Sequence, residues 1–198
     1  MSDLDRLRNA SYQFIQRYVD DIYGVVSSPR HFFRLDKEKT GFIEPSAFAA
    51  FNILIPKLFY ALLLAPLTLG FSLLTVLPTV LYGCCTLFVA AIVIYGLLRY
   101  AGGKENFETA YRNVAYSSVA YYAWLIPVPF LNLILFTASY CVLLYFAFRE
   151  VHELEPQRAI FILILPAFLI LLMGAILSII TLWVLIGGAW TLFHYFYA

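Results

Sequence analysis

Long apolar runs, separated by short loops, constrain this chain more than any other feature. An α-helix needs about 20 apolar residues to cross a hydrocarbon core of about 30 Å, and several runs reach or approach this length. The chain is 63% hydrophobic and only 13% charged, whereas soluble domains carry roughly 25% charged residues. The sequence therefore predicts an all-α fold, a polytopic membrane helical bundle. We expect five transmembrane helices, at 57–76, 79–98, 112–126, 131–148 and from 159 onward.

The part that precedes the first apolar run follows a different pattern. Between residues 3 and 26 apolar side chains recur at three- and four-residue spacing, which predicts an amphipathic helix. Two interpretations stay open: the helix packs on its own bundle or on a partner, or it lies in the plane of the lipid headgroups. The residues of this apolar face are Leu4, Leu7, Phe14, Tyr18, Ile22 and Val25.

A second short helix is expected to follow at the membrane interface. Pro29 suits a first helical position, and Ser27 or Ser28 can cap it. Phe32 and Phe33 then form a short apolar face that we expect at the membrane interface. We accordingly divide the chain into a cytosolic amphipathic and interfacial segment, 1–45, and a five-helix transmembrane domain, 46–198.

The placement of the charges predicts the orientation of the chain. With five spans, all 13 Lys and Arg residues and all 12 acidic residues fall on the N-terminal side of the membrane. Lys57 is counted there, at the entrance of the first span, where its amine can reach the headgroups. Because cytoplasmic loops carry the excess of Lys and Arg, we expect a cytoplasmic N-terminus and an extracytoplasmic C-terminus.

The third span is unusually polar for a membrane helix. Its small residues allow close helix approach, so we expect it inside the bundle. Tyr116, Ser117 and Tyr121 are candidates for lining a polar crevice, although tyrosine beside serine and alanine is also ordinary packing between helices. Lys57 joins the crevice if the first span instead begins near Phe48, because an ionisable side chain inside a span marks a functional site.

The loop between the second and third spans begins with two glycines. Gly102 and Gly103 are expected to end the preceding helix through left-handed backbone. Asn106 can cap the next helix, which we expect to start near Phe107.

Signatures of catalysis are absent from the sequence. The chain has no nucleophile elbow, phosphate-binding loop or dinucleotide fingerprint, so we predict no catalytic residue, no cofactor and no metal. His152 lies between Glu150 and Glu153, which we interpret as a solvated helix end, because a metal needs three or four converging ligands. A net charge of +1 argues against nucleic acid as a partner.

Several segments in a fixed order resemble one family. They are SSPRHFF at 27–33, FIEPSAF at 42–48, GGKENFETAYRNVAYSSV at 102–119, the prolines 127 and 129, and REVHELEPQRA at 149–159. This order is similar to the Yip family of five-span membrane proteins, in its prokaryotic branch. The resemblance covers roughly residues 25–182 and implies five spans, a cytosolic N-terminus and a place in the inner or plasma membrane of a prokaryotic cell. Eukaryotic members bind prenylated Rab GTPases, but this chain lacks their Asp-Leu-x-Gly-Pro segment.

Two functions from different classes fit these observations. In the first, the protein is a non-enzymatic scaffold or membrane-organising, trafficking-type protein that acts through its cytosolic face, with the lipid bilayer and a protein as partners. In the second, lipid or a small solute crosses the membrane through the crevice of the third span. A homo-oligomer that forms through Gly174 and Ser178 is compatible with either. Candidate interface residues for the first function are Pro29, Arg30, Phe32, Phe33, Gly102, Gly103 and Phe107.

Overall fold

The computed structural model describes residues 3–68, 70–128 and 130–164, with isolated residues as far as 183. All elements in this part are helices, and it contains no strand. The fifth predicted span lies outside the described residues, apart from a helical stretch at 156–164 and isolated residues beyond it. Gly174 and Ser178 lie outside them as well, so the oligomer that they suggest stays a prediction.

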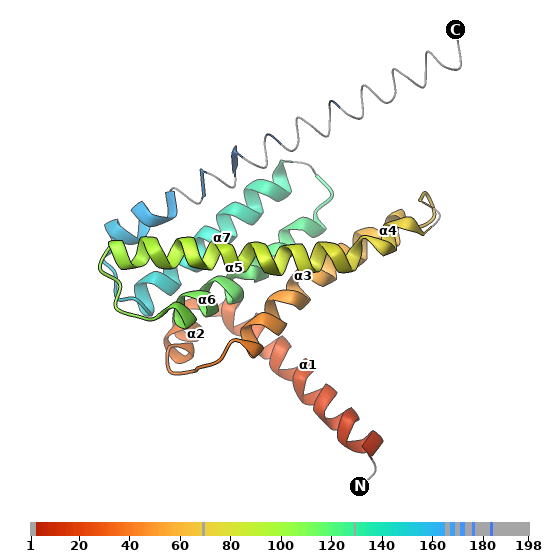
Figure 1. Cartoon of the computed structure of the whole chain (residues 1–198), viewed down its shortest axis with the longest axis horizontal. Coiled ribbons are helices and arrows are strands. Elements are labelled where there is room, and N and C mark those ends of the chain that lie inside the picture. The colour runs from red at the N-terminus through yellow and green to blue at the C-terminus, as the bar shows by residue number, and fades with distance from the viewer. Residues whose placement is uncertain are drawn as a thin grey trace.

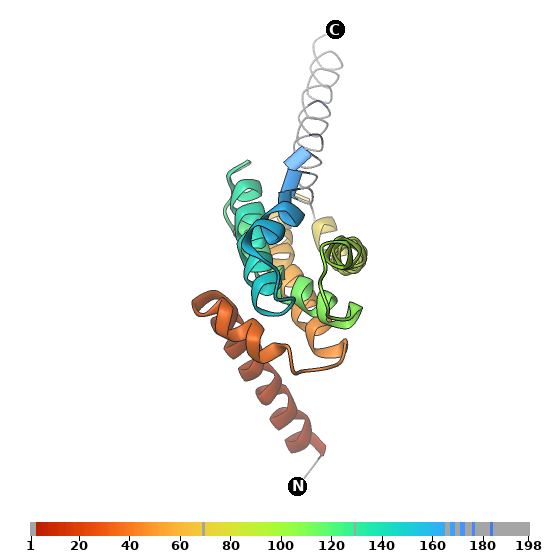
Figure 2. The same cartoon turned by 90° about the vertical axis from the view of Figure 1, so that its left-hand side faces the viewer.

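The two N-terminal helices lie where the sequence predicts them, as α1 (Asp3–Ser27) and α2 (Pro29–Asp36). Pro29 occupies the first turn of α2, and Ser28 is the N-cap residue but makes no capping hydrogen bond with its side chain. Proline is well tolerated there because the first turn has no use for its missing N–H. In Figures 1 and 2, α1 leaves the bundle at an angle, with its N-terminal end away from the other helices.

Helix α3 (Ile43–Leu64) corrects the predicted first span. The helix begins at Ile43 rather than at Lys57, so Lys57 lies well inside it. This helix is compatible with the alternative in which the first span begins near Phe48. The predicted bounds, 57–76, are wrong at both ends, because the helix ends at Leu64 and a turn follows it. Inside α3, the Asn52 side chain is completely buried and hydrogen-bonded to other helices.

The second and fourth predicted spans are confirmed as helices. A short helix, α4 (Phe71–Leu74), precedes α5 (Val76–Tyr100), and α7 covers Leu131–Glu150. Both long helices carry apolar residues around most of their circumference, which is typical of helices that face lipid on one side and protein on the other.

The third predicted span is a broken helix. An α-helical part, α6 (Phe107–Tyr116), continues into a 3-10 helix, η1 (Ser117–Leu125). Runs of 3-10 helix longer than about four residues are uncommon. The Ser117 hydroxyl donates a hydrogen bond of 2.8 Å to the Asn113 carbonyl, a local bond of the kind that competes with regular helix geometry. At 1.5 and 2.0 Å per residue, the two parts together are about 33 Å long.

The broken segment occupies the centre of the fold. Every residue from 109 to 120 is buried, and η1 packs against α7 and α3 while α6 packs against α5. The expectation that the third span lies inside the bundle is therefore confirmed by its burial.

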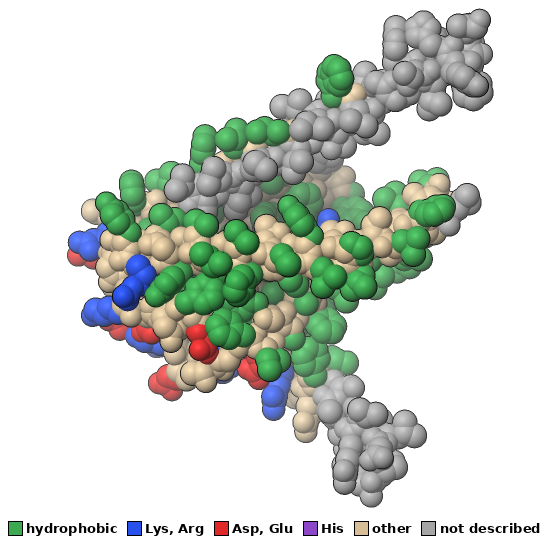
Figure 3. Space-filling model, in the orientation of Figure 1, with side chains coloured by type: hydrophobic (Ala, Val, Ile, Leu, Met, Phe, Trp, Pro, Cys, Tyr) green, Lys and Arg blue, Asp and Glu red, His purple; other side chains and the backbone are tan. Residues whose placement is uncertain are grey.

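Three stretches of the described residues are long and apolar enough to cross a membrane: Ile43–Leu64, Phe71–Tyr100 and Leu131–Glu150. The broken third segment does not satisfy the same criterion, and most of the fifth span is not described, so five spans stay a prediction. Lys, Arg, Asp and Glu side chains gather at one end of the molecule, around α2 and the loops that follow α5 and α7, while hydrophobic side chains cover much of the rest (Figure 3). We call this the charged end.

Candidate functional site

Helix α2 is held to the bundle at the charged end by a buried ion pair. Asp36, at the end of α2, accepts hydrogen bonds from Nε and Nη2 of Arg112 in α6, the first at 3.1 Å. The two side chains are only 3% and 1% exposed. Arg112 also donates from Nη1 to the Gly41 carbonyl at 3.0 Å, and its guanidinium lies 5.6 Å from the ring centre of Tyr116. Bidentate pairing of this kind fixes both distance and orientation.

Sequence reasoning missed this pair. Neither residue is among the candidates predicted from the sequence, where Arg112 is only the first residue of the third span, 112–126. The two residues are 76 positions apart, and neither belongs to a recognisable motif. The one local signal for a buried ion pair was the position of Asp36, directly after the apolar face of a short helix.

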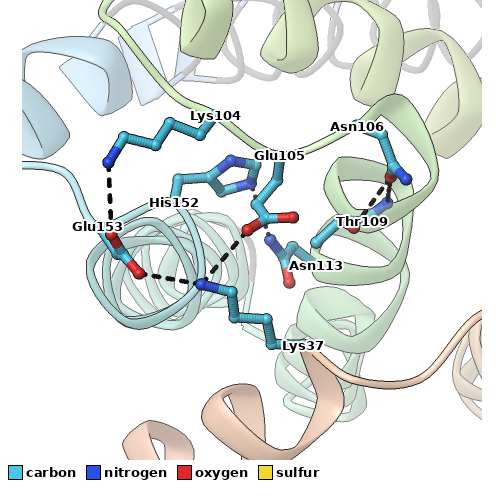
Figure 4. Close-up of polar contacts among 8 residues, drawn as sticks. All are labelled: Lys37, Lys104, Glu105, Asn106, Thr109, Asn113, His152 and Glu153. Atoms are coloured by element: carbon cyan, nitrogen blue, oxygen red, sulfur yellow. Dashed lines mark hydrogen bonds and ion pairs between the residues drawn. The ribbon is translucent and has the colours of Figure 1, made fainter.

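Four exposed or half-exposed charges form a second layer at the charged end, joined by ion pairs (Figure 4). Lys37 lies 3.0 Å from Glu153 and 3.3 Å from Glu105, and Lys104 lies 3.8 Å from Glu153. The hydrogen bond between Lys37 and Glu153 raises the pKa of the Lys37 amine and lowers the pKa of the Glu153 carboxyl. The four charges thereby connect α2 to the loops that follow α5 and α7.

A further ion pair joins the outer surface of α2 to α7. Arg34 donates to Glu150 at 2.7 Å, with its own side chain 68% exposed. Exposed pairs contribute little to stability, roughly 0–1 kcal/mol each. At this position the exposed ion pairs matter for geometry rather than for stability. Together they connect α2 to α7 and to the loops that follow α5 and α7.

His152 lies beneath this layer, and its environment differs from the predicted one. Its side chain is 3% exposed rather than solvated, and Nε2 lies 3.2 Å from the amide nitrogen of Asn113 in α6. Burial, together with the nearby Lys37 charge, lowers the pKa of the imidazole to about 4. His152 is consequently neutral near pH 7. Within the described residues, Nδ1 of His152 and Oδ1 of Asn113 have no hydrogen-bond partner.

The loop at Gly102 and Gly103 ends α5 as predicted. Gly102 has φ +93°, and the amides of Gly103 and Gly102 donate to the carbonyls of Leu98 and Arg99 at 2.8 and 3.2 Å. This pair of bonds is the Schellman arrangement. A Cβ atom on Gly103 would lie 2.9 Å from the Leu98 carbonyl oxygen, so both positions require glycine.

The start of α6 also matches its prediction. Asn106 is the N-cap, and its side-chain oxygen accepts a bond of 2.9 Å from the Thr109 amide. Phe107, the first residue of α6, is half-buried and its ring lies 5.6 Å from that of Phe88 and 5.7 Å from that of Tyr95, both in α5. Phe107 therefore contributes to the packing of α6 on α5.

The predicted interface residues of α2 divide into two sets. Arg30 is exposed and lies 5.3 Å from the Phe146 ring in α7, and Pro29 is half-buried. Phe33 is fully buried and Phe32 partly so, with the Phe32 ring 5.0 Å from that of Tyr116. The expectation that Phe33 lies at the membrane interface is therefore wrong, because α2 packs against α7 and buries this side chain inside the bundle.

The predicted crevice residues do not line one open cavity. Tyr116 and Ser117 have no exposed surface, so in this arrangement they are packing residues. Tyr121 is half-buried, with its ring 5.0 Å from that of Phe136. Lys57 stands apart from them, and its amine lies 6.0 Å from the ring centre of Trp124 at the far end of η1.

A polar network that the sequence did not predict joins α1, α3 and η1. The Asn52 amide donates to the Ser118 hydroxyl at 3.0 Å, and its oxygen accepts from the Tyr18 hydroxyl at 2.8 Å. Tyr18 also shares a hydrogen bond of 2.8 Å with Tyr122. Buried amides need such partners, and here the bonds fix α1 against the centre of the bundle.

The charged end is a surface whose side chains are fixed by ion pairs and hydrogen bonds. Among the described residues no group of three or more His, Cys, Asp or Glu side chains could hold a metal ion. His152 lies in the interior, and the charged groups around it are engaged with one another.

Comparison with protein families identifies the relationship. The family model described as the Yip1 domain matches residues 23–179, which is most of the chain. The chain belongs to the Yip1 family. The matched region of this Yip1-domain protein includes α2, the Asp36–Arg112 pair, the glycine turn and His152, so the whole charged end lies within the domain. No curated protein and no solved structure matches the chain.

Proposed function

We propose that this Yip1-domain protein is a non-enzymatic scaffold in the membrane, which recruits a protein partner through its charged end on the cytosolic side. One observation carries the proposal. The exposed charges of the charged end are held in a fixed arrangement by ion pairs and by the buried contact between Asp36 and Arg112. A surface that is ordered before binding loses less conformational entropy when a partner docks.

The orientation follows from the positive-inside rule. The Lys and Arg residues of α2 and of the loops after α5 and α7 lie at one end of the described bundle, and such residues are enriched on the cytoplasmic side. Lys57 departs from the original charge count, because it lies within α3. The remaining cations still favour a cytosolic charged end.

Photo-cross-linking in native membranes tests the recruitment. A photoreactive amino acid replaces Leu35, which is 56% exposed on α2, and separately Leu62, which is 56% exposed on α3 and serves as a matched control. We expect a discrete protein adduct from position 35 and none from position 62, where lipid is the neighbour. The absence of a protein adduct at position 35 would contradict the recruitment role.

A second function, passage of lipid or a small solute, is favoured by one observation: Lys57 lies inside an apolar helix, next to the end of the irregular η1. Ionisable side chains at such positions mark pathways in many transporters. Reconstituted protein tests it in an assay of fluorescent-lipid transfer between leaflets and of ion flux. Movement that is lost in the Lys57→Ala variant would establish this function in place of the scaffold. Movement no faster than in empty vesicles would eliminate it.

A further inference from the structure

Helix α1 carries a second apolar stripe that the bundle leaves uncovered. Its spacing of three and four residues places all five members on one side of the helix. These side chains are between 55% and 73% exposed, although all are large and apolar. The stripe consists of Tyr12, Ile15, Val19, Tyr23 and Val26.

The stripe is distinct from the face that packs on the bundle. Tyr18, Ile22 and Val25 turn inward, and Val25 is fully buried. Each residue turns an α-helix by about 100°, so Val19 lies beside this inward face and not opposite to it. The far side of the helix carries the polar residues, among them Gln16 and Asp20, both of which are exposed. The helix surface thus has an inward face, an uncovered apolar stripe and a polar face.

The contacts of α1 show how far it lies from the charged end, measured along the spans. Tyr18 bonds to Asn52, nine residues into α3 from Ile43, which is about 14 Å along the helix. Val26 shares a groove with Val142, eight residues before the end of α7 at Glu150, which is about 12 Å. Two points along α1 therefore meet two spans at similar depths, as expected for a helix that lies across the bundle.

The direction of the polar face agrees with this depth. Arg17 lies 3.7 Å from Glu44 in the first turn of α3, so polar side chains of α1 point towards the charged end. Phe14, three residues before Arg17 and on the same side of α1, packs its ring 5.3 Å from that of Phe51 in α3. The stripe lies roughly opposite Arg17 on the helix, so it points away from the charged end, and its last member, Val26, lies beside α7.

From this geometry we propose that α1 is embedded in the leaflet at the charged end, with the stripe from Tyr12 to Val26 in contact with lipid acyl chains. Interfacial helices lie about 5–10 Å into the boundary between headgroups and acyl chains. The contacts of α1, about 12–14 Å along α3 and α7, are somewhat deeper and still lie within one leaflet of a core about 30 Å thick. The inference goes beyond recruitment, because lipid contact by α1 requires no protein partner. A helix inserted into one leaflet only also expands that leaflet relative to the other.

Spin labels on α1 test the proposal in the full-length protein, reconstituted in vesicles of phosphatidylcholine and phosphatidylglycerol. The free cysteines Cys84, Cys85 and Cys141 are replaced by alanine, and single cysteines for labelling are introduced as Val19→Cys and Tyr23→Cys. Gln16→Cys and Asp20→Cys are matched controls on the polar face of the same helix. Gel filtration selects variants that keep the elution volume of the unmodified protein.

Collision of each label with oxygen, which concentrates in lipid, and with a water-soluble nickel chelate gives the result. We expect the ratio of oxygen to nickel accessibility to be severalfold higher at positions 19 and 23 than at 16 and 20. Equal ratios at all four positions would overturn the proposal, because the stripe would then face water. Low accessibility to both reagents at 19 and 23 would also overturn it, by showing that protein covers the stripe.

Discussion

Removal of the Asp36 carboxylate is expected to destabilise the protein far more than removal of an exposed charge. In Asp36→Ala, the guanidinium of Arg112 stays 1% exposed but loses both bonds to the carboxylate and keeps only the Gly41 carbonyl. Breaking a buried pair in this way costs about 3–5 kcal/mol, because an uncompensated charge is left behind. Arg34→Ala, which breaks the exposed pair with Glu150, should cost at most about 1 kcal/mol.

The assay is unfolding by increasing fractions of sodium dodecyl sulfate in mixed micelles, followed by circular dichroism. A double variant, Asp36→Leu with Arg112→Met, separates the unpaired charge from lost packing. Replacement of both partners by apolar residues is often neutral, and the exposed Gly41 can bond to water. We therefore expect the double variant to recover most of the loss. If it is as unstable as Asp36→Ala, or if Asp36→Ala is no worse than Arg34→Ala, the argument from the buried charge is refuted.

Three further outcomes follow from the charged end and the centre of the bundle. The folded-state pKa of His152 is about 4, below its ordinary value of 6.5, so the unfolded chain binds the extra proton between these values. Stability should fall as the pH is lowered from 6.5 to 4, by on the order of 3 kcal/mol, and His152→Gln should flatten this part of a pH series of unfolding curves. Gly102→Ala places a Cβ at φ +93° and should cost about 1–2 kcal/mol, whereas Gly96→Ala, where nothing lies within 4 Å of the new atom, should stabilise the exposed helix by about 0.5–1 kcal/mol. The opposite order of melting temperatures would contradict the assigned turn. Asn52→Ala leaves the Ser118 hydroxyl without its amide donor and should cost about 1–3 kcal/mol, and a melting temperature equal to that of the unmodified protein would show that the network is not formed.

Local features of the fold could be predicted because they depend on neighbours in the sequence. The glycine turn after α5 and the Asn106 cap follow from backbone freedom and from side-chain hydrogen bonding within a few residues. The bounds of α5 and α7 follow from apolar runs that are interrupted only by turn residues. The family relationship was predicted from the order of short segments and is confirmed by the Yip1-domain match.

Features that depend on distant partners could not be predicted. The burial of Asn52 inside α3 could not be predicted, because a buried amide is acceptable only when Tyr18 and Ser118 supply its bonds, and neither partner is visible from the local pattern. The same holds for Asp36. The apolar face of α1 was predicted with two alternatives, packing on the bundle or a partner and contact with lipid headgroups. The uncovered stripe beside it became recognisable only once the bundle showed which side it covers.

The orientation of the charged end is the central claim of this account, and labelling from one side of the membrane tests it most directly. A membrane-impermeant maleimide is added to sealed, inside-out vesicles. The vesicles contain one of two variants, Lys104→Cys at the charged end or Leu67→Cys after α3, and the introduced cysteine is the position that is labelled. These side chains are 81% exposed in both cases. We predict labelling of position 104 and protection of position 67 until the vesicles are opened. Protection of position 104 with labelling of position 67 would place the charged end outside the cytosol and contradict the proposed function.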